Sequence, residues 1–313
     1  EVVAGDAAEN LVCHDAAGKQ RWNLKLSKYY GPNANTVHLS SADIDGSGKK
    51  VVLAATAGWK LYAVNPDGAV RWESFTFYHP QTKAEYFKDD SGTSYIAVGT
   101  AYQTPLNIVS PKDGKVLWHV WEEMGSEFIA KTQYCGIILT DMAFLDTDRD
   151  GVKEVVFGTK YNTIYALDAR TGAMKWEANV GDEVTAVRLV NGRPDGEPLI
   201  AVTTDSGDLV LFNRSGGKVR STTLASGIAD IGMLPLPGMK RTDIVAGMRD
   251  GGVAVLDDRS LLARAALAPS GTPVKGIIYS GKDGDGEVFF TVGSTRIDTV
   301  RYRPHDLWKM RTD

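Results

Sequence analysis

A short pattern, glycine followed four positions later by tryptophan, occurs four times in this 313-residue chain. The four copies are Gly18–Trp22, Gly68–Trp72, Gly114–Trp118 and Gly172–Trp176. Successive tryptophans are 50, 46 and 58 residues apart, a spacing typical of one supersecondary unit repeated along a chain. The fold must therefore give each tryptophan an equivalent place in a repeated unit.

Each copy lies within a set of four short strands. In the clearest copy the expected strands are Ile137–Asp146, Glu154–Lys160, Thr163–Ala169 and Ala173–Val180. A tight hairpin that needs a positive φ is expected at Asp67-Gly68, Asp113-Gly114 and Thr171-Gly172. Four strands in each unit predict the blades of an all-β propeller, and no segment of ten residues has a convincing helical period.

The repeat spacing extends to the end of the sequence, although the fifth copy has Ser221 in place of the tryptophan. We therefore predict a seven-bladed β-propeller of four-stranded antiparallel blades, as one domain over residues 1–313. The blades are expected at 2–26, 37–74, 84–120, 137–180, 184–224, 228–267 and 274–311, the last with Trp308 in its outer strand.

The first blade is expected to be incomplete, because its sequence begins at a second strand. Either this blade has three strands, or its inner strand lies upstream in a longer chain that carries other domains. The second alternative is favoured, because a ring closes best against an intact inner layer that covers the strand edges.

Composition excludes two classes of partner. The chain has 35 basic and 39 acidic residues and a net charge of −4, so it lacks the basic excess of a nucleic-acid binder. No apolar run approaches the length of a membrane-spanning helix. Cys13 and Cys135 form no metal or redox motif and are expected to be structural thiols.

The segment from Ala166 to Trp176, Ala-Leu-Asp-Ala-Arg-Thr-Gly-Ala-Met-Lys-Trp, resembles the tryptophan-docking repeat of quinoprotein-type propellers. The resemblance implies that each tryptophan packs against a peptide of the neighbouring blade. It says little about activity, because pyrroloquinoline-quinone (PQQ) dehydrogenases and an outer-membrane assembly scaffold share the repeat. The dehydrogenases usually have eight blades and an adjacent-cysteine disulfide. This chain has no such cysteine pair, so PQQ is not an expected cofactor.

The segment from Asp146 to Glu154 fits Asp-x-Asp-x-Asp-Gly-x-x-Glu and resembles the calcium loop of FG-GAP repeats of the integrin type. Alternating carboxylates, a sharp bend at glycine and a closing acid suit a hard cation. The expected calcium ligands are Asp146, Asp148, Asp150, Glu154 and the Val152 carbonyl. The alternative is a charged, solvated turn. The related segments Asp43–Gly48 and Lys282–Glu287 each lack a ligand and are interpreted as turns.

Quinoprotein-like repeats combined with calcium-type loops are typical of extracytoplasmic proteins, so we expect a secreted, periplasmic or cell-surface location. In propellers, the link from one blade to the next crosses the top face. Three links look long, at Ser27–Thr36, Ser74–Lys83 and Trp121–Gly136, and they contain most of the exposed-type aromatic residues. Loops on a rigid scaffold often carry function. The expected ligand site is lined by Tyr30, Asn33, Tyr78, His79, Trp121, Glu127 and Tyr134; the alternative is that these side chains only pack the loops.

Two classes of function fit these loops. One is a non-catalytic binding or scaffold module for a carbohydrate or a protein, favoured because no strong catalytic motif occurs. The other is a polysaccharide lyase or glycosidase, since several such families use this fold. For a lyase, His79, Tyr134 and Lys131 are the candidates for base, acid and charge-neutralising cation. Glu122, Glu123 and Glu127 could instead supply a glycosidase carboxylate pair.

Overall fold

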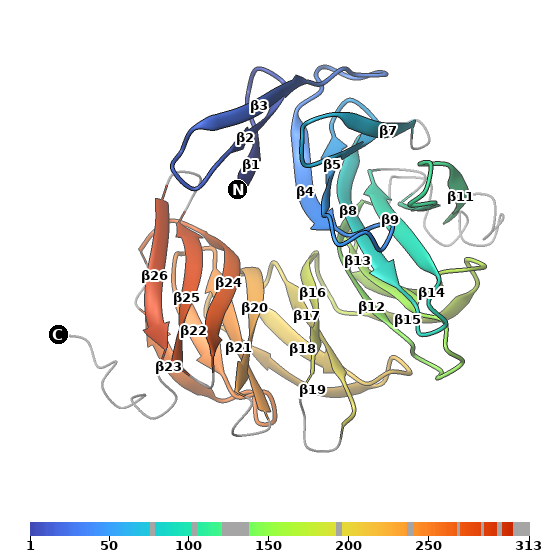
Figure 1. Ribbon diagram of the computed structural model, residues 1–313. Coiled ribbons are helices and arrows are strands. Elements are labelled where there is room, and N and C mark those ends of the chain that lie inside the picture. The colour runs from blue at the N-terminus through green and yellow to red at the C-terminus, as the bar shows by residue number, and fades with distance from the viewer. Residues whose placement is uncertain are drawn as a thin grey trace. The chain divides into compact units, whose positions relative to one another are not determined.

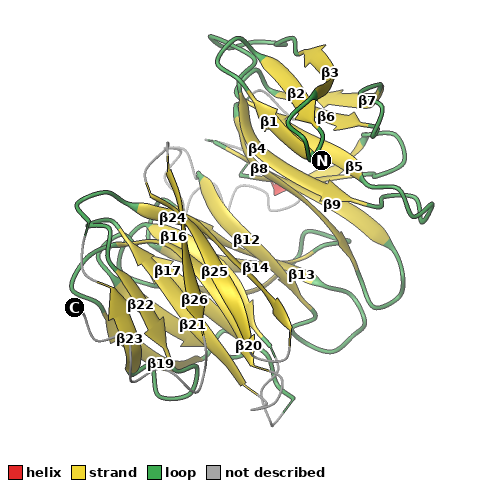
Figure 2. Cartoon of the chain, turned by 60° about the vertical axis from the view of Figure 1, so that its left-hand side comes forward, coloured by secondary structure: helices red, strands yellow, loops and turns green. Residues whose placement is uncertain are grey.

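The structure is a computed structural model that describes residues 1–75, 79–101, 105–120, 138–191, 196–236, 241–267, 270–282, 285–292 and 296–302. The elements in these ranges are 26 β-strands, which dominate the cartoon in Figure 2. The expected all-β, antiparallel architecture is therefore confirmed. Among the described residues, we find no helix long and apolar enough to cross a membrane.

The described strands, many of which are labelled in Figure 1, form seven antiparallel sheets, and within each sheet every strand pairs with the next one along the chain. Five sheets have four strands; the first and the last have three. The chain divides into two compact units, one of residues 1–140, 149–155 and 166–175, the other of residues 141–148, 156–165 and 176–313.

The first unit holds the first three sheets. The first sheet consists of β1 (Val2–Gly5), β2 (Asn10–His14) and β3 (Gln20–Lys25). The second consists of β4 (Thr36–Ala42), β5 (Val51–Thr56), β6 (Lys60–Val64) and β7 (Val70–Phe75). The third consists of β8 (Gln81–Lys88), β9 (Ser94–Thr100), β10 (Leu106–Val109) and β11 (Val116–His119).

The fourth sheet has strands with residues in each unit: β12 (Leu139–Leu145), β13 (Glu154–Thr159), β14 (Thr163–Asp168) and β15 (Met174–Asn179). The second unit holds the rest. The fifth sheet consists of β16 (Val184–Val190), β17 (Leu199–Thr204), β18 (Asp208–Phe212) and β19 (Lys218–Thr223). The sixth consists of β20 (Ile228–Leu236), β21 (Arg241–Met248), β22 (Val253–Leu256) and β23 (Ala263–Leu267). The seventh consists of β24 (Val274–Lys282), β25 (Asp285–Val292) and β26 (Arg296–Tyr302).

The hydrophobic core lies between consecutive sheets rather than inside any one of them. One cluster joins Leu11 and Leu26 to Ala54 and Val64, between the first and second sheets. Corresponding clusters lie between the second and third sheets and between the fifth and sixth. Middle strands such as β17 are buried along their whole length, whereas the outer strand β15 alternates exposed and half-buried residues. Middle strands are therefore continuously apolar, and outer strands show the period of two that one covered face requires.

The repeated tryptophans tie each sheet to the next through their indole N–H groups. Trp22 donates to the Pro66 carbonyl at 2.9 Å, Trp72 to Pro111 at 3.0 Å, Trp118 to Ala169 at 2.9 Å and Trp176 to Arg214 at 2.8 Å. Each acceptor belongs to the hairpin before the outer strand of the following sheet. The docking implied by the quinoprotein resemblance is therefore confirmed. Trp72 and Trp118 are buried, whereas Trp22 and Trp176 are only half-buried, so the four equivalent positions differ in how far the ring is covered.

The structure explains why a glycine accompanies each tryptophan in the repeat. Gly68 and Gly114 have φ values of 88° and 74°, as their hairpins require. A Cβ atom on Gly68 would lie 2.7 Å from the Trp22 ring, and one on Gly114 would lie 2.7 Å from the Trp72 ring. The same glycine therefore closes its own hairpin and receives the indole of the preceding sheet.

Replacement of Trp118 tests how much this docking contributes to stability. Trp118→Ala should lower the free energy of unfolding by about 3–5 kcal/mol, because a large buried ring is lost. Trp118→Phe keeps a ring but leaves the Ala169 carbonyl without its donor, and should cost about 1–2 kcal/mol. Urea denaturation measures both. Leu117→Ala on the exposed side of β11 is the control; equal losses for Leu117→Ala and Trp118→Ala would contradict the docking role.

Candidate ligand-binding site

The three expected loops differ in what the structure describes. The first link, residues 26–35 between β3 and β4, is fully described. The second is shorter than expected, because β7 continues to Phe75 and β8 begins at Gln81. Most of the third link lies outside the described residues, as do the site candidates Tyr78, Trp121, Glu127, Lys131 and Tyr134. Of the proposed catalytic trio, only His79 is described.

The first link is held against the β5–β6 hairpin by backbone contacts. The Tyr29 N–H donates to the Gly58 carbonyl at 2.9 Å, and the Ala57 N–H donates to the Asn35 carbonyl at 2.9 Å. A Cβ atom on Gly58 would lie 2.9 Å from the Lys28 Cα and 3.1 Å from the Asn33 carbonyl oxygen. Only glycine allows this close approach of two backbones. The link is therefore a docked segment with a defined position.

Three aromatic side chains form a row on this docked segment and its neighbours. The Tyr30 and Trp59 ring centroids are 4.6 Å apart, and those of Trp59 and His79 are 5.9 Å apart. Tyr30 is 64% exposed, and Trp59 and His79 are half-buried. We call Tyr30, Trp59 and His79 the aromatic shelf. It joins two predicted site residues to Trp59, which the sequence reasoning missed.

Trp59 occupies an unusual backbone conformation. It lies in the β5–β6 hairpin with a φ of 67°, in the left-handed region that bulky residues rarely adopt. The same turn position holds Glu9 in the first sheet, Asn162 in the fourth, Gly207 in the fifth and Gly251 in the sixth, all with positive φ. Glycine and asparagine suit this position, so the tryptophan is there at a conformational cost of about 1–3 kcal/mol.

The polar side chains around the shelf hold the link in place. The Asn33 side-chain oxygen accepts the Asn35 N–H at 3.1 Å, so Asn33, a predicted ligand residue, supports the loop. The Lys28 ammonium donates to the Gly31 and Pro32 carbonyls at 2.9 and 3.2 Å. The shelf therefore rests on a hydrogen-bonded base, while its outermost ring, Tyr30, faces solvent. Tyr29 and Phe75 form a second ring pair, with centroids 4.0 Å apart.

The inner strands of the second and third sheets bring together His38, Glu85 and Lys83. The Ala84 N–H donates to His38 Nδ1 at 3.3 Å, and His38 Nε2 lies 3.4 Å from Glu85 Oε1. The Lys83 ammonium lies 3.6 Å from the same oxygen. Both His38 ring nitrogens thus have partners, which makes this histidine a link between β4 and β8.

The expected calcium loop connects β12 to β13. Asp146, Asp148 and Glu154 can each place a carboxylate oxygen within 4.8 Å of the others, a grouping that could hold a cation. The Asp150 carboxylate accepts the Val152 N–H at 2.8 Å and lies outside this group. Glu154 is fully buried. The structure therefore brings three of the expected carboxylates together, and the fourth accepts a hydrogen bond within the same turn.

The side chain of a lysine, Lys175, lies beside the same carboxylates. The Lys175 ammonium is 3.7 Å from an Asp168 oxygen, 3.9 Å from Asp150 and 4.0 Å from Glu154. Buried carboxylates need a countercharge, and Lys175 supplies one from β15.

The related turn at Asp43–Gly48 satisfies its own carboxylates. Asp43 accepts the Ser47 and Gly48 N–H groups at 3.1 and 2.8 Å. Asp45 forms an ion pair of 2.7 Å with Arg71. The hydrogen bonds from Ser47 and the Arg71 guanidinium hold the pKa of Asp45 well below its usual range. These bonds are those of a turn, as expected.

A second acidic group, missed by the sequence reasoning, lies in the sixth sheet. Asp243, Asp257 and Asp258 are all buried, with carboxylate oxygens within 4.8 Å of one another. Arg264 on β23 contacts Asp257 and lies 3.4 Å from Asp243. Asp257 also accepts three hydrogen bonds in the following turn. No sequence motif marks this group, because Asp243 lies on β21 whereas Asp257 and Asp258 lie in the turn after β22.

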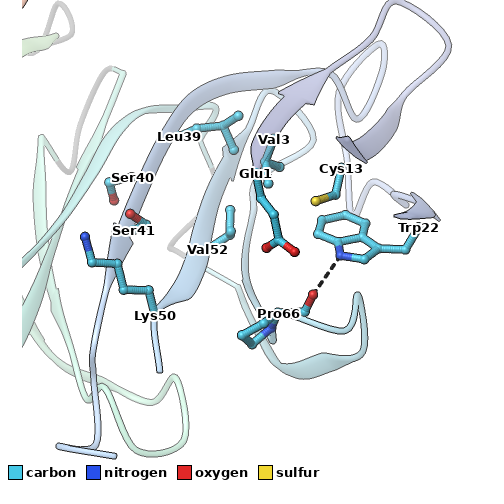
Figure 3. Close-up of a pocket in the computed structure, with 10 residues that line it drawn as sticks. All are labelled: Glu1, Val3, Cys13, Trp22, Leu39, Ser40, Ser41, Lys50, Val52 and Pro66. Atoms are coloured by element: carbon cyan, nitrogen blue, oxygen red, sulfur yellow. Dashed lines mark hydrogen bonds between the residues drawn. The ribbon is translucent and has the colours of Figure 1, made fainter. Parts of the chain in front are cut away.

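Figure 3 shows a pocket of about 440 Å³ beside β1. Val3, Trp22, Leu39 and Val52 line it and also belong to the core between the first and second sheets. The remaining lining residues are Glu1, Cys13, Ser40, Ser41, Lys50 and Pro66. The lining comes from the first sheet and from β4, β5 and the β6–β7 hairpin of the second sheet, so the pocket lies between these two sheets. Burial raises the pKa of the Cys13 thiol, which keeps it protonated and unreactive.

Comparison with known proteins identifies the fold. Residues 1–118 match the family described as the lambda-carrageenase β-propeller domain, and residues 160–263 match the family of the outer membrane protein assembly factor BamB, a PQQ-type repeat family. The chain is a β-propeller with PQQ-like repeats. Each match covers less than half of the chain. No curated protein matches significantly.

Solved propeller structures resemble the chain over 96% of its length. Sqt1 of Saccharomyces cerevisiae aligns with a TM-score of 0.75 and 12% identity over 80% of its own chain. The computationally designed Ika8 protein gives 0.69 and 16% over 80% of its chain. BBS1N, crystallised in complex with ARL6DN, gives 0.66 and 13% over 91%. At these identities the similarity concerns the fold alone.

His79 should make stability sensitive to mild acid. Burial lowers the pKa of its imidazole below the ordinary value of about 6.5. Below that pH the unfolded chain binds a proton more readily than the folded chain does, so stability should fall as the pH drops. His79→Gln should reduce the loss of melting temperature between pH 7 and pH 5. The effect should be small, because His79 is partly exposed. His14→Gln is the control, and identical pH profiles for wild type and His79→Gln would contradict the expectation.

Proposed function

We propose that this propeller is a carbohydrate-binding module whose ligand stacks on the aromatic shelf. The observation that carries the proposal is a row of three rings, of which Tyr30 is exposed and Trp59 and His79 are partly accessible, beside a link fixed by backbone hydrogen bonds. Sugar rings have apolar faces that pack on aromatic side chains, and a preformed surface loses little entropy on binding. The tryptophan in a left-handed turn adds support, because strained residues concentrate at functional sites.

The comparison with carrageenase supports a polysaccharide ligand. The matched region, residues 1–118, contains all three shelf residues. A polymer of this kind is found outside cells, so we also propose an extracytoplasmic location. The finer architecture belongs to the same proposal: the seven sheets would be the seven blades of one ring, with the shelf on its top face.

A polysaccharide-active enzyme is the second candidate, and the name of the matched domain favours it. His79 lies on the shelf, and its lowered pKa keeps the imidazole neutral near pH 7, as a general base requires. An assay of new reducing ends in carrageenan and in uronic-acid polymers separates the two candidates. Release of oligosaccharides would make the chain an enzyme; binding without release would make it a binding module. Capture of a protein partner with no glycan binding would reject both.

Tyr30 provides the direct test of the binding proposal. Tyr30→Ala should weaken glycan binding by about tenfold, corresponding to roughly 1.4 kcal/mol, because an exposed stacking face is lost. The melting temperature should stay unchanged, because Tyr30 is 64% exposed. A carrageenan oligosaccharide and isothermal titration calorimetry provide the measurement. Tyr161→Ala, another exposed tyrosine at a hairpin, is the control; a similar loss there would contradict the assignment.

We further propose that the loop of Asp146, Asp148 and Glu154 binds one structural calcium ion, with Asp150 and the Val152 carbonyl completing its ligands. Calcium should raise the melting temperature, because a ligand that binds only the folded state stabilises it. The increase should disappear in Asp148→Asn and persist in Asp45→Asn. Differential scanning calorimetry in calcium and in excess chelator checks this, and identical melting temperatures would identify the loop as a turn balanced by Lys175.

A further inference from the structure

The rings of the aromatic shelf are tilted relative to one another. The interplanar angle is 45° between Tyr30 and Trp59 and 53° between Trp59 and His79. A flat ribbon of sugar rings, or a crystalline polysaccharide face, stacks best on coplanar aromatic rings. A chain whose sugar rings rotate from one unit to the next instead meets each tilted ring face in turn. The angles of the shelf therefore match a twisting chain.

The tilt is fixed by the backbone around the central ring. Trp59 is held in a hairpin with positive φ, and the neighbouring link is hydrogen-bonded to that hairpin at Ala57 and Gly58. A Cβ atom on Gly31, which also has positive φ, would lie 3.1 Å from the Ala57 carbonyl and 3.6 Å from Trp59 Nε1. The link thus lies directly against the indole and limits its rotation. Flattening the shelf would require undocking the link.

The choice of residue at this turn points to the same conclusion. Asn162, Gly207 and Gly251 occupy the corresponding turn in other sheets, so the hairpin itself needs no large side chain. A bulky ring here is unfavourable for the backbone, yet part of its surface stays accessible. The large ring is therefore better explained by what it contacts outside the protein than by the turn.

We infer that the aromatic shelf selects a soluble glycan chain that twists between successive sugar rings, over flat or crystalline polysaccharide, with Trp59 as the central specificity-determining ring. This inference rests on the proposed carbohydrate-binding function. The bound glycan segment is short, because the shelf has only three rings. The shelf binds a single glycan chain and not the surface of packed chains.

A matched set of soluble oligosaccharides tests this selection on the whole chain. Maltohexaose and cellohexaose have the same sugar and the same length, but the α-linked chain coils and the β-linked chain is a flat ribbon; a carrageenan hexasaccharide is the third probe. Calorimetry should show that maltohexaose or the carrageenan hexasaccharide binds at least roughly tenfold more tightly than cellohexaose. Tightest binding of cellohexaose would overturn the inference and leave the proposed function intact. Absence of binding to all three would reject the proposed function itself.

Trp59→Asn tests the role of the central ring. The variant should lose roughly tenfold in affinity for the tightest probe, while the unfolding midpoint stays unchanged or rises, because asparagine tolerates the left-handed turn. Trp59→Phe keeps a smaller ring and should show an intermediate affinity. This variant keeps the test valid if Trp59→Asn fails to fold. Tyr161→Asn is the matched control. Unchanged affinity in both Trp59 variants would show that the ring does not determine specificity.

Discussion

The hydrogen bond from an indole N–H to a carbonyl of the next sheet is the contact on which the first part of the fold depends. It recurs at Trp22, Trp72, Trp118 and Trp176. The carbonyl gives the indole N–H an acceptor, which the N–H needs because packing of the ring shields it from water. In the fifth sheet Ser221 pairs with Val210 where the earlier sheets have tryptophan. Ionic contacts join the fifth sheet to the sixth, where Arg188 contacts Asp230 and Arg249 contacts Asp205; Arg188 also contacts Asp141 of the fourth sheet, beside the Trp176 junction. Indole docking is insensitive to salt, whereas partly exposed ion pairs are screened by it, so the two kinds of junction respond differently to conditions.

Much of this architecture follows from local rules that a sequence displays. The positive φ of Gly68, Gly114 and Gly172 was predictable, because short hairpin loops of this kind end in a residue with a left-handed backbone conformation. The length of the second link was not, since β7 continues to Phe75 and β8 starts at Gln81 through pairing with neighbouring strands. Trp59 was not predicted for a related reason: it lies in a hairpin within a sheet, whereas the predicted ligand residues all lie in links between sheets. Its meeting with Tyr30 depends on the docking of the link onto that hairpin, which no local pattern encodes.

The acidic loop shows which part of a site a sequence motif can predict and which part it cannot. The spacing of Asp146, Asp148 and Glu154 predicted a cluster of oxygens, and the structure forms that cluster. The motif could not reveal Lys175, which comes from another strand and approaches Asp150 and Glu154. A tethered ammonium already supplies part of the charge balance that a divalent ion would provide. The affinity of such a site for a cation depends on the free energy needed to move the lysine ammonium away from the carboxylates. That free energy is set by the fold and not by the motif.

The antiparallel order of the strands places the docking contacts of Trp22 and the Trp59 turn at opposite ends of the second sheet. In the second sheet, successive strands run antiparallel, so the β6–β7 hairpin and the β5–β6 hairpin lie at opposite ends. The first end carries Pro66 and Gly68, which receive Trp22; the second carries Trp59 and the docked link. A strained turn at the second end does not disturb the docking contacts at the first, because the full length of the sheet lies between them. The repeated junction thus leaves the opposite end of the sheet free to accommodate a residue with an unfavourable backbone conformation, as at Trp59.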